Sequence, residues 1–211
     1  MKLFVSSIAL IWAGLLLATP AAADDGRGEA LFNLCTQCHG QQGEGRQYIE
    51  APAIAGLPAW YVQKQLENFK SGARGTHFDD IQGMRMRPMS RSLVGEGDIE
   101  AVAAFVAALP VETPAPTIEG GDVAKGQSLY MLCASCHGID GTGSEPQGGP
   151  PLIGQSDWYI LSSLEKYKAG IRGRDPRDAF GLMMQPMALT LPDEQAMKDV
   201  VAHIMTLSPQ P

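Results

Sequence analysis

The chain has 211 residues and a formal net charge of −7. Apolar residues account for 45% of it and charged residues for 18%, a composition that excludes a disordered, fibrous or wholly membrane-embedded chain. The acidic balance argues against a nucleic-acid partner, because phosphate backbones attract cationic surfaces. An acidic surface suits docking on basic patches of partner proteins, although many other soluble proteins share it.

The first 23 residues have the pattern of a secretory signal peptide. Lys2 supplies the positive start, residues 3–18 are almost entirely apolar, and three alanines at 21–23 form a small-residue cleavage site. We expect cleavage before Asp24, export to the periplasm and no membrane span in the mature chain. The alternative is an uncleaved anchor, since the apolar run is nearly long enough to span a bilayer. The alanines followed by two aspartates favour cleavage.

All four cysteines lie in two short motifs, CTQCH at 35–39 and CASCH at 133–137. Each motif is the attachment pattern of a c-type haem, in which two thiols reach the two vinyl groups of one porphyrin and the adjacent imidazole binds the iron. Disulfides, a zinc site or a thioredoxin-like motif would not explain a histidine directly after each second cysteine. The sequence therefore predicts two covalently bound haems, held by Cys35, Cys38 and His39 in the first motif and by Cys133, Cys136 and His137 in the second.

The two motifs belong to an internal duplication. When the sequence is aligned with itself at an offset of 98 residues, about a third of the roughly 90 paired positions are identical without a gap. Three prolines and a glycine pair interrupt regular structure between the copies. We therefore divide the chain into a signal peptide, two haem domains and a linker, at residues 1–23, 24–110, 111–121 and 122–211.

Each copy is predicted to contain short helices and no strand, which gives an all-α fold of two tandem domains wrapped around their haems. One helix leads into each haem motif, at about 27–36 and 125–134. A second begins near Pro58 or Ser156 and ends at Gly72 or Gly170. The last helix covers about 98–109 in the first copy and 192–207 in the second.

The duplication also restricts the second axial ligand of each iron, because a ligand needed in both copies should recur at the same position. No further histidine meets this condition: His77 pairs with Asp175, and His203 pairs with Phe105. Two methionine positions do meet it, in the stretch Met-x-Pro-Met, namely Met86 with Met184 and Met89 with Met187. A methionine ligand fills the last coordination position and favours electron transfer over peroxide or oxygen chemistry. The alternative is that these methionines only fill the core.

Two such domains in tandem resemble the dihaem class I cytochromes c of the c4 type, and the resemblance covers essentially the whole mature chain. It implies that the first methionine of each motif, Met86 and Met184, is the iron ligand. It also implies that Pro52 and Pro150 offer their carbonyl groups to the proximal imidazoles, which would fix the rings.

The same resemblance implies a close crossing of the first and last helices in each domain, at Gly28 and Gly126. An aromatic side chain on the last helix usually completes that crossing. Phe105 does so in the first domain, whereas the second has His203. This difference leaves the geometry of the second crossing open.

The sequence favours a soluble carrier of up to two electrons between a membrane donor, such as a cytochrome bc complex, and a terminal oxidase or reductase. A haem subunit of a periplasmic dehydrogenase is an alternative, and would expose a large apolar patch when separated from its partner. A two-haem peroxidase is a third, but matching Met-x-Pro-Met motifs in both copies argue against an open iron.

Overall fold

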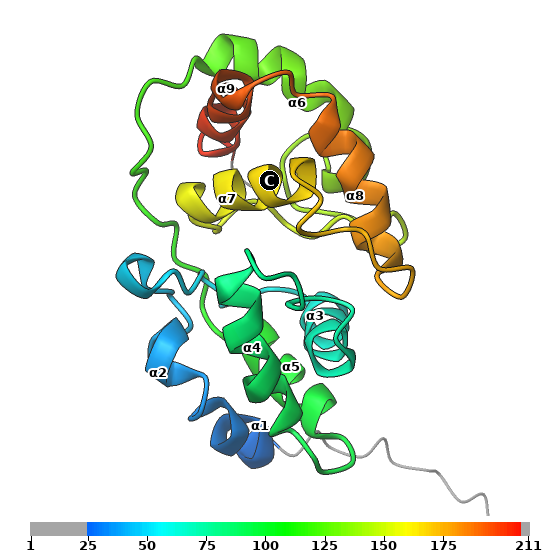
Figure 1. The fold of residues 1–211 in the computed structure, drawn as a ribbon. Coiled ribbons are helices and arrows are strands. Elements are labelled where there is room, and N and C mark those ends of the chain that lie inside the picture. Colours follow the sequence, from blue (N-terminus) through cyan, green and yellow to red (C-terminus); the bar gives the residue numbers. More distant parts are fainter. Residues whose placement is uncertain (1–24, 208–211) are drawn as a thin grey trace, which may run out of the picture.

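The computed structural model describes residues 25–207 and consists of helices joined by loops, with only isolated β-bridges between Arg46 and Ala51 and between Ser144 and Gly149 in this range. The helices form two halves stacked one on the other, as Figure 1 shows, with the residues before the linker below and those after it above. No helix in the described range is long and apolar enough to cross a membrane. The expected signal peptide lies outside the described residues.

The first half contains five α-helices and one turn of 3-10 helix. Their bounds are α1 Asp25–Phe32, α2 Thr36–His39, η1 Gln47–Ile49, α3 Ala59–Ser71, α4 Ile81–Arg91 and α5 Asp98–Ala108. A small core of Phe32, Leu93, Val102 and Val106 holds α1 against α5. This small core fits the limited apolar area that a domain of under 100 residues can bury.

The second half repeats this arrangement with four helices. They are α6 Val123–His137, α7 Asp157–Lys168, α8 Ala179–Leu189 and α9 Glu194–Ile204. The two halves differ in the first helix, because α6 runs without a break into the haem motif, whereas α1 ends at Phe32 and α2 begins only at Thr36; the described part of the second half also lacks a counterpart of η1. The core of this half gathers around Tyr130, Val200 and Val201.

Glycine allows the first and last helices of each half to cross closely. A Cβ at Gly28 would lie 2.5 Å from the carbonyl oxygen of Ala101, and one at Gly126 would lie 1.8 Å from that of Asp199. The ring pair Phe32–Phe105 completes the first crossing at a centroid distance of 5.2 Å, and Tyr130–His203 completes the second at the same distance. His203 therefore takes the aromatic place in the second crossing.

Most of the predicted helices are present, with shifted ends, but α4 and α8 were not predicted. Both contain the Met-x-Pro-Met stretch, and a proline inside a helix normally interrupts it. Pro88 and Pro186 instead lie near the carboxyl ends of these helices. A side chain caps each helix at its start, because Asp80 accepts a hydrogen bond from the amide of Gly83 and Asp178 accepts one from Gly181.

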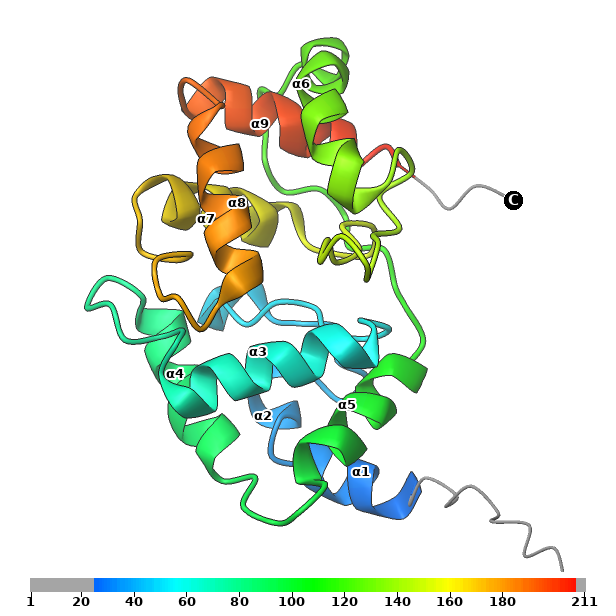
Figure 2. The same cartoon turned by 90° about the vertical axis from the view of Figure 1, so that its right-hand side faces the viewer.

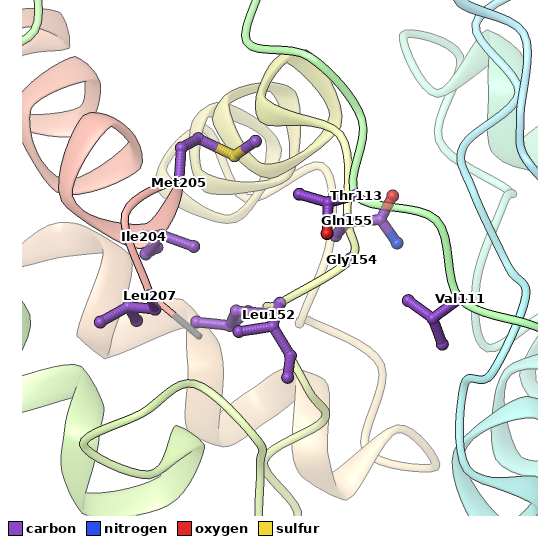
Figure 3. A pocket seen from close by; sticks show the side chains of 9 residues that line it. Val111, Thr113, Leu152, Gly154, Gln155, Ile204, Met205 and Leu207 are labelled. Carbon is purple, nitrogen blue, oxygen red and sulfur yellow. The ribbon is translucent and has the colours of Figure 1, made fainter. Parts of the chain in front are cut away.

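The linker is held where the two halves meet. Val111 packs against Gly56 and Gly154, which occupy equivalent positions in the two halves: a Cβ would lie 2.1 Å from a Val111 methyl group at Gly56 and 2.5 Å from one at Gly154. Two cavities, of about 250 and 210 Å³, lie beside the linker, and Val111 lines both. Figure 3 shows the first, lined by Val111, Thr113 and Leu152 together with side chains at the end of α9. Neither cavity is lined by a cysteine or histidine of the haem motifs.

Candidate haem sites

The proximal histidine of each half is fixed by a backbone carbonyl. The Nδ1 of His39 lies 2.8 Å from the carbonyl oxygen of Pro52, and the Nδ1 of His137 lies 2.8 Å from that of Pro150. Since a carbonyl oxygen can only accept, Nδ1 carries the proton in both rings and donates it. The lone pair is then on Nε2, the nitrogen left for a metal ion.

Burial keeps these two imidazoles neutral. Desolvation lowers the pKa of His39 and of His137 below the ordinary value of 6.5, although the proline carbonyls act in the opposite direction. A neutral imidazole is the form that binds iron. The site therefore presents the histidines in the required state near neutral pH.

The loop after each histidine places the proline carbonyl. The amide of Gly45 donates to the carbonyl oxygen of His39 at 2.7 Å, and the amide of Gly143 donates to that of His137 at 2.8 Å. Both glycines have φ of +83°, in the left-handed region that other residues rarely adopt. The loop turns tightly and returns to the imidazole thirteen residues later.

Cys35, Cys38, Cys133 and Cys136 form no disulfide. Cys35 and Cys133 are half-buried. Each of these cysteines precedes its histidine by four residues in a helical stretch, which brings the thiol and imidazole to the same side of the helix. This donor set fits a porphyrin attached through two thioethers.

The two methionines of the first motif differ in exposure, whereas both methionines of the second motif, Met184 and Met187, are half-buried. Met86 on α4 and Met184 on α8 are half-buried, and Met184 packs against the core of its half. Met89 is 38% exposed at the outer side of α4. Sequence periodicity could not make this distinction, because the stretch was not recognised as helical.

Two arginines that were assigned no role from the sequence, the half-buried Arg74 and the buried Arg172, lie where the halves meet. Arg74 donates to the hydroxyl of Tyr159 across this junction and its guanidinium stacks on Phe69, while Arg172 stacks on Tyr167 in the same way. The Nε atoms of Arg74 and Arg172 are buried without a hydrogen-bond partner among the described residues. Haem carboxylates would supply suitable acceptors. Both arginines recur at the 98-residue offset, and this repetition was the available signal.

These features define a two-haem c-type cytochrome, in which the haem irons supply reversible one-electron transfer. The chain belongs to the cytochrome c family, whose model matches twice, over residues 26–110 and 123–208. Two such domains with Cys35/Cys38 and Cys133/Cys136 imply two covalently bound haems. The fold class predicted from the sequence is confirmed, as is the resemblance to the c4 type.

Several known proteins are similar over most of the chain. A thiosulfate dehydrogenase electron acceptor from Stutzerimonas stutzeri (strain A1501) is 31% identical over 194 residues, covering 83% of this chain and 85% of that protein. A cytochrome c4 from Azotobacter vinelandii is 26% identical over 207 residues, covering 92% of each. The structure of as-isolated thiosulfate dehydrogenase from Marichromatium purpuratum superposes with a TM-score of 0.70 and 28% identity, covering 87% of this chain and 40% of that one. The cytochrome c4 relatives and the electron acceptor are electron carriers, and this chain is likewise an electron carrier.

Proposed function

We propose that the protein is an exported carrier that takes electrons from a thiosulfate-oxidising dehydrogenase and passes them to a membrane oxidase or reductase. His39 and Met86 ligate the first iron, and His137 and Met184 ligate the second. The observation that carries the ligand assignment is the pair of imidazoles held through Nδ1, with Nε2 free for iron and a half-buried methionine at the same place in each half.

In the first half, burial and contact favour the first methionine of the motif, because His39 and Met86 are in contact, which fits ligation of one iron by both side chains. In the second half, Met184 rather than Met187 packs against the core. The exposed Met89 is a poorer candidate for the iron ligand, because the iron of a covalently held porphyrin lies inside the domain. Pro52 and Pro150 act indirectly, by orienting the imidazoles and raising their basicity.

Six-coordinate irons would suit an electron carrier and disfavour turnover of peroxide. Both axial positions are filled by protein atoms, so a small oxidant has no open site. Because the Met-x-Pro-Met motif occurs in both halves, the same argument applies to both irons. A methionine ligand also raises the reduction potential relative to a second histidine, which suits an acceptor.

The partner is inferred from the relatives. Two of them, at 31% and 33% identity, are named thiosulfate dehydrogenase electron acceptors, and a matching structure is itself a thiosulfate dehydrogenase. The c4-type relatives favour a second candidate, a carrier that receives electrons from a membrane cytochrome complex. Export follows from the predicted signal peptide and from haem attachment, which takes place outside the cytoplasm in c-type cytochromes.

Stopped-flow reduction of the ferric holoprotein tests the donor. With catalytic thiosulfate dehydrogenase and excess thiosulfate under anaerobic conditions, we expect both haems to be reduced at a rate that rises with carrier concentration. A c4-type cytochrome serves as the matched control. If the enzyme reduces neither haem but is active with another acceptor, this donor is rejected; reduction by a cytochrome bc complex alone would then favour the second candidate.

A further inference from the structure

The capping carboxylates of the two methionine helices lie deep in the contact between the halves. Asp80, at the start of α4, is 1% exposed, and Asp178, at the start of α8, is 3% exposed. Each caps its own helix, as described above. Each is also within reach of the opposite half.

A side chain from the opposite half binds each cap. The Nζ of Lys166 donates to Oδ1 of Asp80 at 2.7 Å, and the Nδ2 of Asn68 donates to Oδ1 of Asp178 at 3.0 Å. Lys166 lies on α7 and Asn68 on α3, at equivalent positions 98 residues apart. Figures 1 and 2 show α3 and α7 at the facing sides of the two halves. Each half therefore supplies one side chain that binds the capping aspartate of the other half.

We propose that Lys166 and Asn68 are positioning residues that act across the domain boundary, each holding the helix that carries the methionine ligand of the other domain. The proposal rests on the ligation by Met86 and Met184 proposed above. Met86 follows Asp80 by six residues, or about 9 Å along the helix axis. A shift of the anchored end of α4 would move the methionine sulfur relative to the iron.

The two contacts differ in charge, and this predicts unequal effects. Lys166 and Asp80 form an ion pair whose lysine side chain is only 16% exposed. Burial would raise the pKa of Asp80, but Lys166, with smaller contributions from Arg74 and Arg172, lowers it, so the carboxyl is ionised. Loss of the lysine leaves a buried charge without its partner, whereas loss of Asn68 removes only a neutral donor. The first haem should therefore depend on its contact more strongly than the second.

Displacement of methionine by imidazole in the ferric holoprotein measures this anchoring. In Lys166→Met we expect imidazole to bind the first haem roughly tenfold faster or more, as the loss of a hydrogen bond to a charged group implies. Binding at the second haem should be unchanged, and Lys166→Arg should restore the first. Asn68→Leu should accelerate the second haem only, by a smaller factor. Haem methyl NMR signals, assigned with Met86→Ala and Met184→Ala, identify the haem that reacts.

A control separates anchoring from general loosening of the interface. Arg177 donates to the backbone carbonyl of Ser71 in the other half without touching Asp80, so Arg177→Gln should leave the first haem unchanged. Equal acceleration at both haems in Lys166→Met, or none at either, would overturn the proposal. If Met86→Ala instead leaves the methionine-to-iron absorption intact, the ligand assignment itself has failed, and the two failures are distinguishable.

Discussion

At the scale of single residues, the proposed coordination of each iron depends on one methionine sulfur. Met86 and Met89 stand three residues apart on the same helix, yet only the outer one is substantially exposed. Replacing Met86 or Met184 by alanine should remove the methionine-to-ferric-iron charge-transfer absorption of one haem each, halving the total intensity. Met89→Ala and Met187→Ala are the matched controls and should retain it. Full intensity in the Met86 and Met184 variants would refute the assignment.

His203 gives the second domain a pH dependence that the first domain lacks at the equivalent place. Burial lowers the pKa of His203 below 6.5, so the unfolded chain binds its proton more readily than the native one. The contribution to stability is present above about pH 6.5 and is lost as the pH falls towards the native pKa. His203→Phe should reduce this loss, because Phe105 already fills the matching position in the first crossing. Denaturant unfolding of both holoproteins at about pH 7.5 and 5.5 measures the difference; equal losses would contradict it.

At the scale of helices, the crossing of α6 and α9 has no room for a methyl group. Gly126→Ala would place Cβ against the carbonyl oxygen of Asp199, and we expect a loss of about 1–3 kcal/mol from overpacking. This outweighs the roughly 1 kcal/mol that alanine gains over glycine in a helix. Gln127→Ala, on the exposed side of α6, is the control. Chemical denaturation of the holoprotein checks both, and a more stable Gly126→Ala would show that the helices can separate at little cost.

The sequence predicts helices well where local pattern and capping agree, and poorly where they conflict. The helix before Gly72 was predicted to within a residue because a proline precedes it and a left-handed glycine ends it. The methionine helices were missed because proline usually interrupts a helix, whereas here it falls near the end and an aspartate caps the start. The haem motifs and their histidines could be predicted from residue spacing alone. The contacts between Asp80 and Lys166 join residues 86 positions apart and depend on how the halves pack.

At the scale of the whole molecule, the linker contributes to the packing of the two halves. Val111 is the residue that contacts an equivalent glycine in each half. Val111→Ala should weaken this contact and increase the rate of limited proteolysis between residues 110 and 121, with the haem spectra unchanged. Val94→Ala, at a position 83% exposed, is the control. An unchanged cleavage rate would mean that the other contacts between the halves suffice.

The buried polar contacts between the halves also decide whether electron exchange between the two haems depends on protein concentration. Two separate monohaem proteins would have to collide before an electron could pass between them, at a rate set by their concentration. Here Asn68, Arg74 and Lys166 keep the halves together through hydrogen bonds to the opposite half. Exchange between the haems is therefore unimolecular, at a fixed and high effective concentration. A donor that releases electrons in pairs can then discharge both in a single encounter, even where the carrier is scarce.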